Sequence, residues 1–170
     1  KPMDTLEQAG CIIVLGSDLK AESAGFGYRA IKAATKHDAK LVIASARPTS
    51  LDKFANSALR YKAGSEGFVA LGLAKAAINQ NKAAAEGLDT FKQAVAATSF
   101  DQIQAATGLD EAAFNDAVSF INGQVAVMYG FEFIRSADAA AAVTGALNLA
   151  TLTAADLYPV DEKNNTQGML

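Results

Sequence analysis

Two short apolar runs, each followed closely by a small polar residue, constrain the fold of this chain more than any other feature. Residues 11–15 read CIIVL and residues 40–44 read KLVIA. Neither run alternates between apolar and polar residues, so both are typical of parallel strands buried on both faces. Between them lie about 25 residues with a helical pattern over 21–36, which is the length of a strand–helix–strand crossover. A parallel sheet covered by helices is therefore predicted.

The rest of the chain continues the alternation of strands and helices. Further strands are predicted at 57–62 and 124–129, further helices at 68–79, 81–108, 109–121 and 135–153, and a polar loop at 156–170. This order predicts the α/β class, with an open, mostly parallel four-stranded sheet, helices on both faces and a Rossmann-like architecture.

Composition excludes several classes of protein. The 170 residues are 51% hydrophobic, and 15 basic against 18 acidic side chains give a net charge of −3. The length suits one ordinary domain, and the negative charge argues against binding to nucleic acid. No apolar run approaches the roughly 18 residues needed to span a bilayer, so we expect no direct membrane insertion.

Residues suited to catalysis or metal binding are scarce. One cysteine and one histidine exclude an internal disulfide, a cysteine cluster and a two-histidine metal site. Cys11 opens a buried strand and is interpreted as an inert core residue, and His37 as a surface residue at a helix end. No catalytic and no metal-binding residue is therefore predicted, and any chemistry is expected to come from a cofactor or from other domains.

The two ends of the chain suggest a piece of a longer polypeptide. Residue 1 is a lysine rather than an initiator methionine, and residues 164–168 form a dense polar cluster directly before the end. We expect a fragment, with a processed or tag-cleaved whole protein as the alternative.

Small and polar residues follow the predicted strands at their carboxyl ends, where open parallel sheets bind ligands. The candidate residues for binding a nucleotide-like anion are Gly16, Ser17, Asp18, Ser45, Arg47, Gly64, Ser65 and Glu66. Gly16 allows close backbone approach, Arg47 suits a phosphate, and the acceptor-only carboxylate of Glu66 suits the donors of a guanine edge. The helix after Gly16 is expected to add free N–H groups and a positive dipole end.

A purely structural interpretation is open for each of these residues alone. Ser17 or Asp18 can cap a helix, residues 64–65 can form a turn and a cap, and Arg47 can be a solvated surface charge. The functional interpretation requires residues 16–18, 45–47 and 64–66 to lie at one edge of the sheet.

Seven segments, in order along the chain, resemble a known family. They are residues 6–18 (LEQAGCIIVLGSD), 40–56 (KLVIASARPTSLDKFAN), 59–73 (LRYKAGSEGFVALGL), 100–118, 125–130 (VAVMYG), 146–153 (ALNLATLT) and 164–168 (NNTQG). They are similar to segments of the molybdopterin oxidoreductases, the large subunits of the formate dehydrogenase and nitrate reductase type. The same superfamily includes the large iron–sulfur subunit of respiratory NADH:quinone oxidoreductase.

The resemblance implies a role in holding a cofactor. In the family this region holds the guanosine end of a molybdopterin guanine dinucleotide, which would make residues 1–155 a dinucleotide-binding-like domain and residues 156–170 a polar tail. Carried over by position, Gly16, Ser17 and Asp18 would lie along the diphosphate and ribose. Ser45 and Arg47 would lie beside the nucleotide sugar, Gly64, Ser65 and Glu66 at the guanine, and Asn165 and Gln167 along the cofactor. The fragment alone is expected to hold no cofactor and to have no turnover.

Four departures from the family pattern keep alternatives open. Ser45 stands where the family has an acid, Ala46 follows it in place of proline, Asp18 replaces asparagine, and residues 130–132 read GFE where the family has GMG. They favour a cofactor-free scaffold domain, as in the large iron–sulfur subunit of NADH:quinone oxidoreductase. A generic nucleotide-binding α/β module is a further alternative.

The resemblance also implies the setting of the parent protein. We expect an electron-transport oxidoreductase of the formate dehydrogenase or NADH dehydrogenase type, with iron–sulfur centres outside this fragment. Its partners would be other domains of the same chain and subunits of a respiratory complex. The expected location is cytoplasmic, with any membrane association made through the parent complex.

Overall fold

Five strands form one sheet in which every pairing is parallel. The computed structural model describes residues 3–85 and 88–160. The strands are β1 (Cys11–Leu15), β2 (Lys40–Ala44), β3 (Ser57–Leu59), β4 (Val125–Tyr129) and β5 (Asp156–Pro159), in the spatial order β3-β2-β1-β4-β5. The predicted α/β class and parallel sheet are confirmed, with five strands in place of four.

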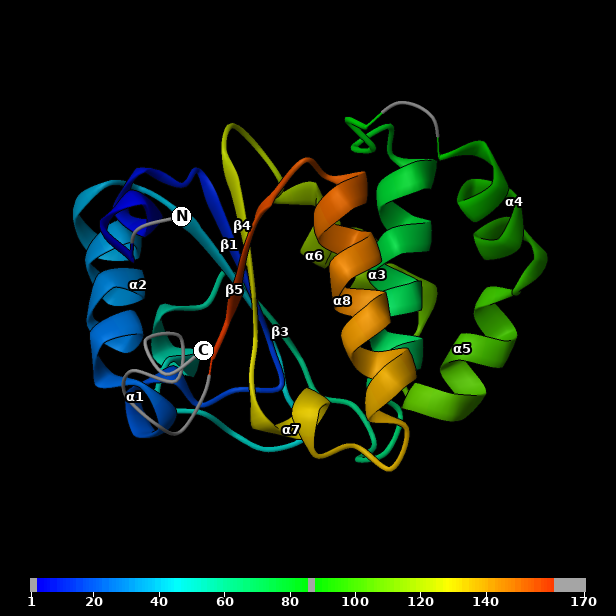
Figure 1. The fold of residues 1–170 in the computed structure, drawn as a ribbon, viewed down its shortest axis with the longest axis horizontal. Helices are drawn as coiled ribbons and strands as arrows, with labels where there is room; N and C mark the ends of the chain where they lie inside the picture. The colour runs from blue at the N-terminus through cyan, green and yellow to red at the C-terminus, as the bar shows by residue number, and fades with distance from the viewer. Residues whose placement is uncertain (1–2, 86–87, 161–170) are drawn as a thin grey trace.

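Helices cover both faces of this sheet (Figure 1). On one side lie η1 (Met3–Gln8), α1 (Leu19–Glu22) and α2 (Ala24–Lys36). On the other lie α3 (Glu66–Asn79), α6 (Glu111–Ser119) and α8 (Ala139–Leu152), with α4 (Asp89–Ala97) and α5 (Phe100–Thr107) outside them. Two short helices, η2 (Asp52–Phe54) and α7 (Phe131–Ile134), follow β2 and β4.

The strands are buried on both faces, as their continuous apolar sequences predict. In β1, Ile12 and Val14 pack in a cluster with residues of α2, whereas Ile13 and Leu15 pack in a second cluster with residues of α3 and α8. All five residues of β1 are at most 1% exposed. Cys11 is one of them, which confirms its place in the core.

The prediction of a loop is wrong for residues 156–159. They form β5, which within the described residues pairs with β4 alone and so lies at the edge of the sheet. Pro159 has no N–H to donate, and an edge position tolerates this because the outer side of an edge strand needs no ladder of hydrogen bonds. The segment resembled a loop because it is short and contains Pro159, although Leu157 and Tyr158 pack against the two apolar clusters.

Three of the predicted helices are interrupted. The helix expected over 21–36 breaks at Ser23, whose φ of −150° is extended, and this leaves α1 only four residues long. The segment 81–108 contains α4 and α5, separated at Ser99, which caps α5 through a reciprocal side-chain capping box. In the segment 135–153, the helix α8 begins only at Ala139, directly after its N-cap residue Asp138. Side-chain capping by Ser99 and Asp138 sets the last two of these boundaries. Ser23 makes no side-chain cap hydrogen bond, and it interrupts the helix through its extended backbone.

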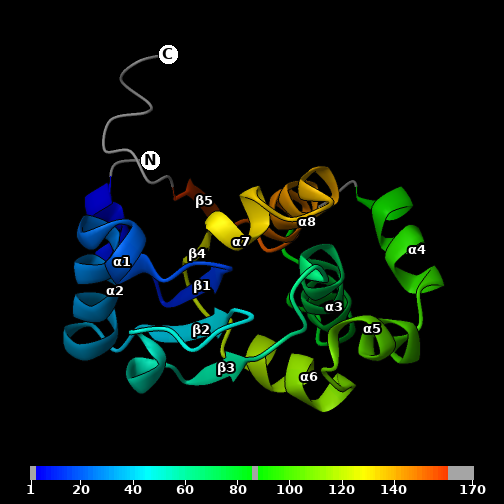
Figure 2. The same ribbon diagram turned by 90° about the horizontal axis from the view of Figure 1, so that it is seen from below.

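The carboxyl ends of the strands are level with one another. Leu15 pairs with both Ala44 and Tyr129, Ala44 pairs with Leu59, and Tyr129 pairs with Pro159. The residues that follow the strands therefore leave the sheet along one row. We call this row the strand-end edge; it is the lower edge in Figure 1, and Figure 2 views the molecule from that side.

Candidate functional site

The strand-end edge contains the point where the strand order reverses. β1 is followed in space by β2 on one side and by β4 on the other, so the loops after β1 and β4 diverge at this point. Gly16 sits at the junction, since its N–H donates to Ala44 O at 2.7 Å and its carbonyl accepts from Glu132 N at 2.9 Å. This is the location at which open α/β sheets bind ligands.

The side-chain carboxylate of Glu132, a residue of α7, lies at the end of β2. Its Oε1 accepts from Ser45 Oγ at 3.0 Å, and its Oε2 accepts from Ala46 N at 2.9 Å and from Tyr61 Oη at 2.7 Å. Arg47 Nε lies 3.4 Å from Oε1, and the glutamate side chain is only 12% exposed. We call this carboxylate and its donors the Glu132 cluster. Residue 45 is a serine where the resemblance leads one to expect an acid, and the carboxylate beside it comes from Glu132 of α7.

Tyr61 and Ser45 are both buried members of the Glu132 cluster. Burial, together with the hydrogen bond to Glu132 and the negative charge of that carboxylate, raises the pKa of the Tyr61 phenol well above its ordinary value. The phenol therefore stays protonated and donates to Glu132 throughout the physiological range.

Glu22 occupies the end of β1. Its Oε2 accepts from Ser17 Oγ at 2.7 Å and from Phe131 N at 3.3 Å, and its Oε1 accepts from Asp18 N at 3.0 Å. We call this the Glu22 cluster. It joins the loop after β1 to the start of α7, so the Glu22 carboxylate bridges β1 and β4 where the strand order reverses.

Asp18 and Arg47, which were predicted to face a dinucleotide, have other surroundings. Asp18 accepts from Ser50 Oγ at 2.6 Å, which turns its charge toward the loop after β2. The Arg47 side chain is 77% exposed and contacts Glu132. The helix that follows Gly16 is the single turn α1, whose dipole is small because only four residues contribute to it.

The predicted guanine-binding loop lies at the same edge of the sheet. Glu66 is 3% exposed, and it accepts from Gly64 N at 2.9 Å and from Ser136 Oγ at 2.7 Å. Ser65 Oγ donates to Lys62 O at 2.6 Å, so it stabilises the turn before α3. Both carboxylate oxygens of Glu66 thus have partners within the chain. Asn165 and Gln167 lie outside the described residues.

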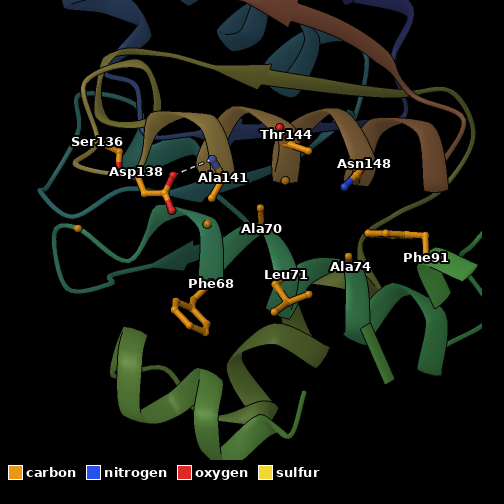
Figure 3. A pocket seen from close by; sticks show the side chains of 13 residues that line it. Phe68, Ala70, Leu71, Ala74, Phe91, Ser136, Asp138, Ala141, Thr144 and Asn148 are labelled. Carbon is orange, nitrogen blue, oxygen red and sulfur yellow. Dashed lines mark hydrogen bonds between the residues drawn. The ribbon is translucent and has the colours of Figure 1, made fainter. Parts of the chain in front are cut away.

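A cavity of about 460 Å³ lies beside this loop (Figure 3). Phe68, Leu71 and Ala74 of α3 line one side, and Ala141, Thr144 and Asn148 of α8 line the other. Asp138, whose carboxylate accepts from Ala141 N at 3.1 Å, lies at one end of the cavity, and Phe91 of α4 contributes a further aromatic wall. The described residues that line the cavity are mainly apolar and include no basic side chain, so it does not suit a phosphate.

The strand-end edge does not fit a dinucleotide as it stands. Its donors are taken by the carboxylates of Glu22 and Glu132. The space beside two of its glycines is filled as well: a Cβ on Gly16 would lie 2.7 Å from Glu132 Cβ, and one on Gly130 would lie 2.5 Å from Glu22 Oε2. A phosphate about 4 Å from either carboxylate would be repelled by roughly 1 kcal/mol in water and roughly 4 kcal/mol near a protein surface for each pair of unit charges.

Two further findings concern the described residues as a whole. They contain no group of three or more His, Cys, Asp or Glu side chains placed to hold a metal ion. Within the same residues, no helix is long and apolar enough to cross a membrane.

Comparison with known proteins identifies the family. The family model for molybdopterin oxidoreductases matches residues 1–166. The chain belongs to the molybdopterin oxidoreductase family. The resemblance seen in its sequence segments is thereby confirmed.

Similar molybdopterin-family chains are much longer than this one. The chain is 40% identical, over 99% of its length, to the NADPH-Fe(3+) oxidoreductase subunit alpha of two Geobacter sulfurreducens strains. It spans 22% of the length of these relatives. Acetylene hydratase from Pelobacter acetylenicus has the same fold, with a TM-score of 0.74 and 19% identity over 85% of this chain and 21% of that one.

Glu22 and Tyr61 are not among the residues predicted from the sequence, and Glu132 stands out there only as a departure from the family pattern. An acidic residue in the first turn of a helix is common because it stabilises the helix dipole, so neither glutamate stood out. For Glu132 the available signal was its position two residues after Gly130, directly after the predicted strand at 124–129. Nothing comparable marks Glu22, which lies seven residues after Leu15 at the end of β1.

Proposed function

We propose that this chain is a structural domain of an oxidoreductase large subunit and that its strand-end edge holds no pterin guanine dinucleotide. The Glu132 cluster carries this proposal. A carboxylate that accepts from Ser45, Ala46 and Tyr61 fills the position beside β2 where a nucleotide sugar would be expected. This favours the scaffold alternative over the cofactor-holding role.

The structural role follows from what the clusters connect. The Glu132 cluster ties α7 to β2 and to the segment after β3, and the Glu22 cluster ties α7 to the loop after β1. The edge is therefore held together by the chain's own side chains. In the parent we expect the domain to support electron-carrying domains of the same polypeptide, since its relatives are oxidoreductase subunits by name.

The cofactor-holding role remains the second candidate because of one observation. Residues 16–18, 45–47 and 64–66 follow the carboxyl ends of β1, β2 and β3, and the resemblance implies a guanine-reading role for Glu66. Under this candidate, Glu66→Ala would weaken guanine-nucleotide binding more than adenine-nucleotide binding. Molybdopterin guanine dinucleotide, if bound, would supply the metal-dependent redox chemistry, and the chain's own residues would only position its guanosine end.

Calorimetry on the 170-residue chain distinguishes the scaffold role from the cofactor-holding role. We expect no heat of binding with GDP or GMP at about 1 mM ligand. Binding of GDP with a Kd below that concentration would contradict the scaffold role. In the full-length parent, the matching measurement is the molybdenum, tungsten and guanine-nucleotide content per chain, and a guanine dinucleotide bound in contact with this domain would also contradict it.

A further inference from the structure

We infer that Glu22 and Glu132 act as internal counter-anions that mask a diphosphate-binding site at the strand-end edge. The ligand class is an inorganic or nucleoside diphosphate, and the masked state is the native one. The inference rests on the proposed function and explains how a fold with this edge excludes the ligand.

The first support is the character of the groups that face the two carboxylates. Three hydroxyls and three backbone N–H groups donate to them, and Arg47 adds a cationic group. The donors come from the ends of β1 and β2, from the segment after β3 and from the start of α7. Six donors gathered from four separate segments and directed at carboxylate oxygens can complement an oxyanion.

The second support is the way that each carboxylate reaches its donors. Glu22 extends to Gly130, where a Cβ would lie 2.5 Å from its Oε2. Glu132 lies against Gly16: a Cβ added to Gly16 would lie 2.7 Å from the Cβ of Glu132. The two glycines that border the reversal of strand order thus leave room for the glutamates. The same room cannot hold a ligand while the glutamates are present.

The third support is the loss of charge balance that a ligand would cause. Of the cations at this edge, Arg47 is already beside Glu132, and Arg60 is ion-paired with Asp52. A diphosphate would therefore add negative charge to an edge that already carries Glu22 and Glu132. Removing the two carboxylates would leave the six donors and Arg47 facing the space they vacate.

The experiment compares the native chain with the double variant E22A/E132A. The control is D101A/E111A, which also loses two carboxylates, both from exposed first turns of helices. Each protein is titrated with inorganic pyrophosphate and with GDP by calorimetry, and its thermal midpoint is measured with and without each ligand. The single variants E22A and E132A, each of which vacates one of the two positions, are measured in the same way.

We expect the native chain and the control to bind neither ligand at about 1 mM, whereas E22A/E132A binds pyrophosphate at least about tenfold more tightly and gains thermal stability with it. A folded E22A/E132A that binds neither ligand overturns the inference and leaves the scaffold role intact. GDP binding by the native chain overturns both. If E22A/E132A does not fold, the same titration decides on the single variants E22A and E132A: pyrophosphate binding by either supports the inference, and binding by neither overturns it. If these variants also fail to fold, refolding of any of the three by pyrophosphate supports the inference and its absence overturns it.

Discussion

Ser45 Oγ donates a 3.0 Å hydrogen bond to Glu132 Oε1, although 87 residues separate the two side chains. The bond joins the end of β2 to the helical turn after β4 across the intervening β1. It places a carboxylate beside a serine that, by the resemblance of the sequence, stands where an acid is expected. The edge of the sheet therefore retains an acidic group there, contributed by a different element.

Replacing Glu132 with alanine is expected to destabilise the fold by about 3 kcal/mol, because the buried donors of Ser45, Ala46 and Tyr61 lose their acceptor. The free energy of unfolding in urea measures this loss. Glu111→Ala, at an exposed helix start, is the matched control and should change stability by less than about 0.5 kcal/mol. Equal effects of the two substitutions would contradict the role given to the Glu132 cluster.

Alanine substitutions at two glycines separate steric crowding from backbone strain. Gly16 has a φ of +60° and its added Cβ would meet Glu132 and Phe133, whereas Gly64 has a φ of +89° with nothing within 4 Å. Gly64→Ala should therefore cost about 1 kcal/mol from strain alone, and Gly16→Ala about 4 kcal/mol from strain and overpacking together. Chemical denaturation of both variants measures the difference in their free energies of unfolding. Equal losses would show that Glu132 and Phe133 move aside from the added Cβ without a measurable loss of stability.

The Tyr61 phenol should stay protonated in the folded protein at a pH where ordinary tyrosines ionise, about 10. Burial and the bond to Glu132 raise its pKa. The unfolded chain then releases this proton first, so the contribution of Tyr61 to stability is present below about pH 10 and is lost as the pH rises toward the raised value. In a spectrophotometric titration, Tyr61→Phe should leave the tyrosinate absorbance gained below about pH 11 unchanged. Loss of a quarter of the signal, one tyrosine of the 4 in the chain, would contradict this.

Cys11 should resist thiol reagents in the folded state. Burial raises the pKa of its thiol to about 12, and the side chain is fully enclosed in β1. Since the thiolate is the reactive form, labelling by a disulfide reagent at about pH 8 should require unfolding. Parallel labelling with and without urea measures the protection. Stoichiometric labelling of the native chain within minutes would mean that β1 opens readily.

The sequence by itself determined the class of the fold and the location of its edge. Continuous apolar runs at 11–15 and 40–44 can be satisfied only by strands covered on both faces, and the strand–helix spacing requires parallel pairing. These signals are local, because each depends on the residues of one element and its neighbours in the chain. The convergence of residues 16–18 with 45–47 follows from them.

Tertiary structure alone decided how that edge is filled. The polar segment 156–159 becomes a strand only because β4 offers it an edge to pair with. Glu22 and Glu132 accept from their partners only because the order β3-β2-β1-β4-β5 brings the ends of β1, β2 and β4 together. A carboxylate has the same sequence signature whether it caps its own helix or accepts from a distant strand. Its partners are set by strand order and register, which no single segment contains.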